Sequence, residues 1–215
     1  MRLFRFLAIL FEATYSEQLS LKVNLNWSQF CLVVYWRSFT MGKPNAKQRI
    51  LDAAGRLFHK QGYSNVGINE IIKQAETAKA SFYQHFKSKE SLCEAWLEDV
   101  HERSEDSREE ILKDDQKSTE EKLSFYFDEL ANYLVQSDFR GCPYTNTGAM
   151  VDTESVGVFK QIKCHKESVR NFFEAILESK YGKSKAVAQL ANQVFIIYSG
   201  ATTEAQNLRL SLIHI

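Results

Sequence analysis

The chain carries its clearest structural signal between residues 68 and 92, which read Ile68-Asn69-Glu70-Ile71-Ile72-Lys73-Gln74-Ala75-Glu76-Thr77-Ala78-Lys79-Ala80-Ser81-Phe82-Tyr83-Gln84-His85-Phe86-Lys87-Ser88-Lys89-Glu90-Ser91-Leu92. Apolar residues recur here at helical spacing on both sides of a turn. The pattern predicts short helices over 68–74 and 78–85, and Ser88 as the N-cap of a third helix. Small and polar side chains crowd the second helix, so it can approach base edges and phosphates in a DNA major groove.

The composition favours an all-α fold. The 215 residues are 44% hydrophobic and 25% charged, with only two prolines and nine glycines. These values suit a globular chain with long helices, and no segment alternates like a strand. A length of 215 residues suffices either for one large domain or for two small ones.

Charge is distributed unevenly along the chain. Residues 41–90 hold nine Lys/Arg and four Asp/Glu, a net of +5, whereas residues 91–150 hold six and fifteen, a net of −9. A basic module followed by an acidic one suits a polyanion-binding head on a body that repels polyanions. Two ordinary solvated faces would give the same numbers.

The first helix of the head is predicted over 46–61. Its apolar stripe is Ile50, Ala53, Ala54, Leu57 and Phe58. Gly62 follows as a residue able to end the helix with a positive φ.

Five further helices are predicted for the body. We expect them over 88–113, from 118 with a capping box, over 145–152, over 155–180, and from a Ser184 cap to 208. The middle of the first, residues 101–110, is almost wholly polar, and we expect it to be exposed. Residues 139–143 are predicted to be a loop.

Both ends differ in character from the rest. We interpret 1–40 as an atypical extension ahead of a fresh start at Met41, and 209–215 as an atypical, truncated tail. A membrane-targeting role for 1–40 stays open, although its apolar run from 30 to 36 is too short to span a bilayer. The four cysteines show no disulfide framework, which favours a cytoplasmic location.

The segment 47–92 resembles the TetR family of bacterial transcriptional regulators. The resemblance rests on Ile50-Leu51-x-Ala53-Ala54-x-x-Leu57-Phe58, Gly62-Tyr63, the helix over 68–72, and Phe82-Tyr83-x-x-Phe86-Lys87-Ser88-Lys89-Glu90-x-Leu92. Over 93–208 the likeness is only in the number, length and order of helices.

The resemblance implies an N-terminal three-helix DNA-binding head, 41–92, and a helical ligand-binding and dimerisation body, 93–208. It implies a homodimer that binds a double-stranded DNA operator and a small-molecule effector, with no cofactor. Carried over by position, the groove-facing residues are Lys79, Ala80, Ser81 and Gln84, and the phosphate-contacting residues are Tyr83, His85 and Lys89.

The chain departs from the family pattern at three places in the head. Glu76 stands where the family usually has Gly, and Ala78 where it often has Ser, so Thr77 is expected to cap the helix instead. Val66-Gly67 replaces a common Thr-Ser pair. The family body also usually continues with another helix after the one ending near 208.

Cys142 is a possible sensor thiol, because Gly141-Cys142-Pro143-Tyr144-Thr145-Asn146-Thr147 lies between helices. A small buried cysteine beside a turn is the alternative, and Cys164 beside His165 is a weaker candidate. No nucleophile, nucleotide or metal motif is present, so we predict no enzyme and no metal site.

These observations predict a homodimeric repressor that leaves a near-palindromic operator when a small effector binds or a thiol is modified. The alternative is a helical small-molecule-binding protein or enzyme whose head has lost DNA binding.

Overall fold

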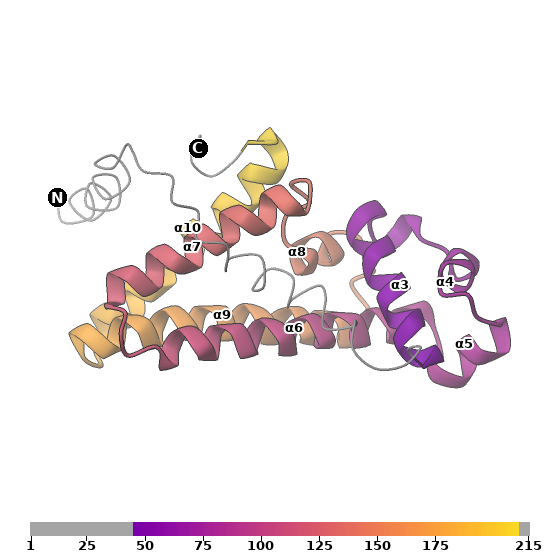
Figure 1. The fold of residues 1–215 in the computed structure, drawn as a ribbon, viewed down its shortest axis with the longest axis horizontal. Coiled ribbons are helices and arrows are strands. Elements are labelled where there is room, and N and C mark those ends of the chain that lie inside the picture. The colour runs from indigo at the N-terminus through magenta and orange to yellow at the C-terminus, as the bar shows by residue number, and fades with distance from the viewer. Residues whose placement is uncertain (1–44, 211–215) are drawn as a thin grey trace.

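The computed structural model describes residues 45–210, which fold entirely into helices and connecting segments without a strand (Figure 1). Counted within this range, there are eight α-helices and one short 3-10 helix. In chain order they are α3 (Ala46–Gln61), η1 (Tyr63–Asn65), α4 (Ile68–Gln74), α5 (Lys79–His85), α6 (Lys89–Lys113), α7 (Thr119–Gln136), α8 (Pro143–Gly148), α9 (Val156–Tyr181) and α10 (Lys185–Leu208). The predicted all-α class is confirmed.

Local signals set the ends of the helices in the head. α3 begins where the Asn45 side chain accepts a hydrogen bond from the Gln48 amide, and it ends at Gly62, whose φ is 88°. The predicted bounds of α3 and α4 are confirmed, and α5 begins one residue later than predicted. The predicted apolar stripe of α3 is buried throughout.

Two long, roughly parallel helices, α6 and α9, form the spine of the body (Figure 1). α9 packs against α6, α7, α8 and α10, so it is the central helix. Serine caps at Ser88, Ser118 and Ser184 open α6, α7 and α10, as predicted, and the first two are capping boxes.

The core of the head continues into the body. Phe58 of α3 lies with its ring centroid 5.6 Å from that of Trp96 on α6. The same buried cluster extends to Tyr144 on α8 and Val158 on α9. A movement of α6 or α8 would therefore change the packing of the head directly.

Two predictions about the body were wrong in detail. The middle of α6 is not wholly exposed: His101 and Arg108 are buried, at 9% and 2% exposure, because α9 runs alongside and covers them. The short helix α8 begins at Pro143 and ends at Gly148, not over 145–152, because proline is well placed at the first position of a helix.

No helix between residues 45 and 210 is both long enough and apolar enough to cross a bilayer. The predictions for residues 1–40 and for most of 209–215 concern parts of the chain outside the described range.

Candidate nucleic-acid interface

The turn between α4 and α5 is a Schellman motif. The Thr77 amide donates to the Ile72 carbonyl and the Glu76 amide to the Lys73 carbonyl, both at 3.2 Å. Glu76 occupies the left-handed position with φ 49°, as the departure from the family pattern predicts. The turn thus keeps its geometry with a residue that is strained there.

Arg49 on α3 holds this turn through hydrogen bonds to two of its carbonyl groups. Its Nε donates to the carbonyl of Ala75 at 3.1 Å, and Nη2 donates to that of Glu76 at 3.5 Å. Sequence reasoning missed this residue, because nothing local to Arg49 signals an acceptor 26 residues away.

α5 has one buried edge and one exposed face. Phe82 and Phe86, at 0% and 4% exposure, anchor it to the core of the head. The predicted groove residues Lys79, Ala80 and Gln84 are exposed, and Ser81 is half-buried. Tyr83, at 47% exposure, and His85 are exposed as well, so six of the seven predicted DNA contacts lie on this short helix.

The N-terminus of α5 has no side-chain cap. Ala78 is the N-cap residue, and Thr77 does not take over the role that the sequence suggested for it. Gly67 likewise caps α4 without a side-chain hydrogen bond. The first amides of both helices are therefore available to a phosphate or to water.

Lys89 lies apart from α5 at the start of α6. Its Nζ donates to the carbonyls of Tyr63 and Val66, each at 3.0 Å, and lies 4.3 Å from the centroid of the Tyr63 ring. Burial lowers the pKa of Lys89. Two of the three ammonium hydrogens therefore hold η1 and the residue after it in place.

With this geometry in place, comparison with known proteins identifies the head. The family model described as "Bacterial regulatory proteins, tetR family" matches residues 50–96. The head of the chain belongs to the TetR family. In this TetR-family head the matched segment contains α4, α5 and the turn between them.

Curated relatives share the head and part of the body. The chain is 35% identical over 107 residues to the HTH-type transcriptional regulator LmrA of Bacillus subtilis, covering 48% of this chain and 55% of that protein. It is 26% identical over 99 residues to the HTH-type transcriptional repressor NemR of Escherichia coli, covering 46% and 50%. The chain thus spans about half the length of the curated relatives that it matches.

Solved structures extend the likeness in fold to most of the described residues. The reduced form of E. coli NemR superposes with a TM-score of 0.68 at 23% identity, covering 77% of this chain and 89% of that one. A TetR transcriptional regulator from Legionella pneumophila gives a TM-score of 0.72 at 24% identity, covering 79% and 91%. At these identities the structures establish the common fold of the body.

The candidate thiols lie in different settings. Cys142 is half-buried at the start of α8, where its Sγ accepts a hydrogen bond from Lys166 Nζ at 3.6 Å. Cys164 is exposed, and its neighbour across the helix pair is His101, with Sγ 3.7 Å from Nε2, rather than the adjacent His165. Within the described residues no cluster of His, Cys, Asp or Glu is arranged to hold a metal ion.

A polar bridge joins the head to the loop that carries Cys142. The hydroxyl of Tyr133 on α7 lies 3.0 Å from His59 Nε2 on α3 and donates to the Gly141 carbonyl. Arg140 Nε donates to the His59 carbonyl at 3.0 Å. Only the tertiary structure brings these residues together, since His59 and Tyr133 are 74 positions apart.

Proposed function

We propose that this protein is a DNA-binding transcriptional regulator that acts as a homodimeric repressor on a near-palindromic operator. The observation that carries the proposal is the face of α5, where polar and small side chains stand exposed above a buried Phe82 and Phe86. The surrounding head has a net charge of +5 over residues 41–90, which favours approach to a polyanion.

Each predicted contact residue of α5 takes a role that follows from its chemistry. Lys79 and Gln84 read base edges, since lysine can donate to guanine and an amide can pair with adenine. Ala80 and Ser81 are small enough to let the helix approach the floor of the groove. Tyr83 and His85 contact phosphates, which position the head without reading sequence.

Lys89 contributes mainly by supporting the head. Two of its hydrogens hold the carbonyls of Tyr63 and Val66, and the third contacts a phosphate next to the end of α5. Its substitution is therefore expected to weaken the head as well as its DNA contact.

Pairing of two subunits takes place through α10. This helix exposes Ile196 at 67% and Ile197 at 47%, and a side chain added at Gly200 would meet no atom within 4 Å. An apolar strip beside a glycine permits close approach of a second helix. A symmetric pair would place two copies of α5 in successive major grooves, about 34 Å apart.

Release from DNA follows from the continuity of the head with the body. An effector that binds the body tightly in only one arrangement of α6 shifts the population towards that arrangement. Modification of Cys142 would act on the same route, because Gly141 beside it accepts a hydrogen bond from Tyr133, which also contacts His59 of the head.

The test is a gel-shift series on duplexes selected from random DNA, using the full chain. Tyr83→Phe is expected to weaken binding to all duplexes alike, by about fivefold, since it removes one hydrogen bond to phosphate. Gln84→Ala is expected to relax the preference at one base pair, at a cost of about 1–3 kcal/mol. Lys183→Ala, an exposed lysine of the body, is the matched control and should change neither.

A folded, paired protein that ignores every duplex at low ionic strength would contradict the proposal. Equal sequence preference in Gln84→Ala and the parent chain would contradict the role assigned to that residue.

A further inference from the structure

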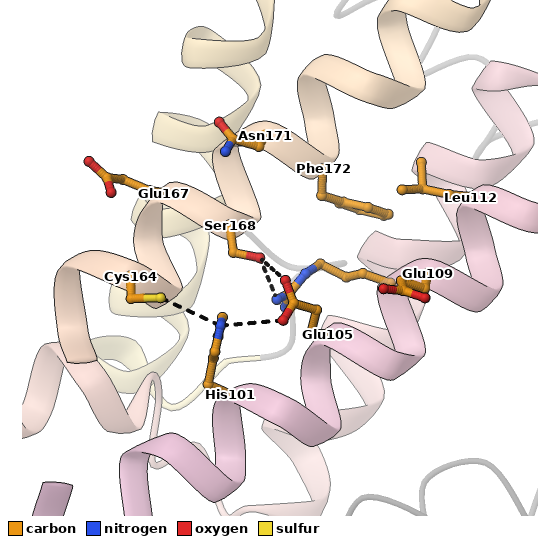
Figure 2. Close-up of a pocket in the computed structure, with 10 residues that line it drawn as sticks. His101, Glu105, Glu109, Leu112, Cys164, Glu167, Ser168, Asn171 and Phe172 are labelled. Atoms are coloured by element: carbon orange, nitrogen blue, oxygen red, sulfur yellow. Dashed lines mark hydrogen bonds and ion pairs between the residues drawn. The ribbon is translucent and has the colours of Figure 1, made fainter. Parts of the chain in front are cut away.

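A pocket of about 540 Å³ opens between α6 and α9 in the body (Figure 2). Because the two helices run parallel, the side chains that line it lie in successive levels one turn or so apart. His101 lies opposite Cys164, Arg108 opposite Ser168, and Leu112 opposite Phe172. The pocket thus has a polar end and an apolar end.

Arg108 is the unusual member of this lining. Its side chain is almost fully buried, at 2% exposure, yet no carboxylate of the described residues forms an ion pair with it. Its hydrogen bond in the pocket is from Nη2 to Ser168 Oγ, at 3.0 Å. A guanidinium has five N–H donors, and a buried charge without an anionic partner is costly.

The carboxylates of the pocket already have partners. Glu109 pairs with Lys113 at 2.7 Å, and Glu167 pairs with Lys163 at 3.9 Å. The two lysines lie outside the pocket lining. Glu105 accepts a hydrogen bond from Ser168 at 3.2 Å and lies 3.5 Å from His101 Nε2. Its side chain is 48% exposed, so it can turn to solvent when another anion approaches Ser168.

The apolar level lies one helical turn beyond the arginine. Leu112 follows Arg108 by four residues on α6, and Phe172 follows Ser168 by four residues on α9. One turn corresponds to a rise of about 5.4 Å. A molecule with an anionic group and an apolar group separated by about that distance would reach both levels.

We propose that this pocket binds a small carboxylic acid with an aromatic or aliphatic body. The carboxylate pairs with the planar fork of Arg108 and accepts a hydrogen bond from Ser168, while the body packs on Phe172 and Leu112. The role of such an acid as the effector rests on the proposed function, but its binding does not. Both α6 and α9 contribute to the site, so the ligand would bear on the helix that continues from the head.

The proposal is tested by isothermal titration of the full chain with three molecules of one shape: phenylpropionate, phenylpropanol and phenylpropylamine. We expect the acid to bind at least about tenfold more tightly than the alcohol, and the amine to bind least, because a cation would face Arg108. Equal binding of acid and alcohol, tighter binding of the amine, or no binding of the acid at about 5 mM overturns the proposal.

Variants locate the site. Arg108→Lys keeps the positive charge but loses the planar guanidinium, so it should weaken binding of the acid by about tenfold. Ser168→Ala should weaken binding of the acid by about threefold to tenfold. This variant avoids any folding defect that a change of the buried Arg108 could cause. Glu105→Gln should strengthen binding of the acid by removing a like charge. The control is Arg103→Lys on the same helix, which pairs with Asp99 and does not line the pocket.

Unchanged binding of the acid in both Arg108→Lys and Ser168→Ala overturns the proposal. The titration uses no DNA, and the gel shift uses no acid. Loss of one result while the other stands therefore separates a failure of the pocket from a failure of the regulator.

Discussion

Single residues in the head carry conflicting demands, and Glu76 shows this most clearly. The Schellman turn needs a left-handed residue, and Glu76 supplies it at φ 49° without the freedom of glycine. Arg49 helps to hold the strained position by donating to the carbonyls of Ala75 and Glu76. The turn that aims α5 is thus maintained by tertiary contact as well as by local preference.

Glu76→Gly is expected to raise the free energy of unfolding by about 1 kcal/mol, because it removes the cost of a side chain in the left-handed region. Urea denaturation followed by circular dichroism measures this. Glu76→Ala is the matched control: it removes the same carboxylate but keeps a Cβ, and should give little gain. Equal stabilisation by both substitutions would point to charge rather than to backbone strain.

Lys89 was predicted from the family resemblance as a phosphate contact, and the structure gives it a second task. The carbonyls of Tyr63 and Val66 lie within reach only because η1 folds back over the start of α6. Sequence spacing carries no trace of this, since the acceptors are backbone atoms 26 and 23 residues away. The phosphate contact itself stays a prediction.

Helices of the body bury groups that their own sequences suggest are exposed. The polar middle of α6 was expected to face solvent, but His101 and Arg108 lie against α9. His165 of α9 is buried too, with its ring stacked on Tyr144 of α8 at a centroid distance of 3.7 Å. The contact between α6, α8 and α9 therefore contains a neutral imidazole.

Because His165 is buried, we expect the free energy of unfolding to depend on pH. Burial, with the nearby charge of Arg108 as the next cause, lowers the pKa of His165 to about 2, below the unfolded value of 6.5. The unfolded chain then binds a proton that the folded chain does not, so stability is complete above about pH 6.5 and falls as the pH is lowered towards 2. The expected loss from this group is about 1.4 kcal/mol per pH unit below that point.

Urea denaturation from about pH 7 to pH 5 checks this in the parent chain and in His165→Phe, which preserves a ring to stack on Tyr144. The slope should be shallower in the variant. His59 also has a lowered pKa, chiefly through burial, so His59→Phe serves as the comparison for a second buried histidine. Identical slopes in His165→Phe and the parent chain would contradict the prediction.

At the scale of the whole molecule, the surface proposed for DNA and the surface proposed for pairing lie in different parts of the described fold. α5 lies at one end of the subunit and α10 lies in the body (Figure 1). The polar side chains of α5 are exposed, and α10 exposes Ile196 and Ile197. In the proposed dimer, α10 would hold the two heads at the fixed separation that two half-sites require. Pairing and DNA affinity should therefore be lost together.

Ile196→Glu is expected to weaken pairing by about 3 kcal/mol or more, since each subunit would lose a buried isoleucine and gain a charge at a symmetric contact. Analytical ultracentrifugation measures the effect. Val135→Glu changes another exposed apolar residue, on α7 at 55% exposure against 67% for Ile196. It is the control and should leave the association state unchanged. A paired Ile196→Glu protein would move the interface away from α10.

Local chemistry was enough to predict the helices of this protein and the polar face of α5. Local signals include the caps at Ser88, Ser118 and Ser184, the glycine end at Gly62 and the turn at Glu76. All of them act through atoms a few residues away. Apolar periodicity then identified which edge of α3 is buried. Such signals can be read along one dimension, because the interacting groups are close in the chain.

Only the tertiary structure decided which helix each buried edge meets. The periodicity of α6 does not reveal that α9 lies beside it, so Arg108 and Ser168, 60 residues apart, could not be paired in advance. The same holds for the bridge from His59 to Tyr133. A hydrophobic stripe is non-directional and favours any apolar partner, whereas the polar groups carried along with it become neighbours only after the helices have packed.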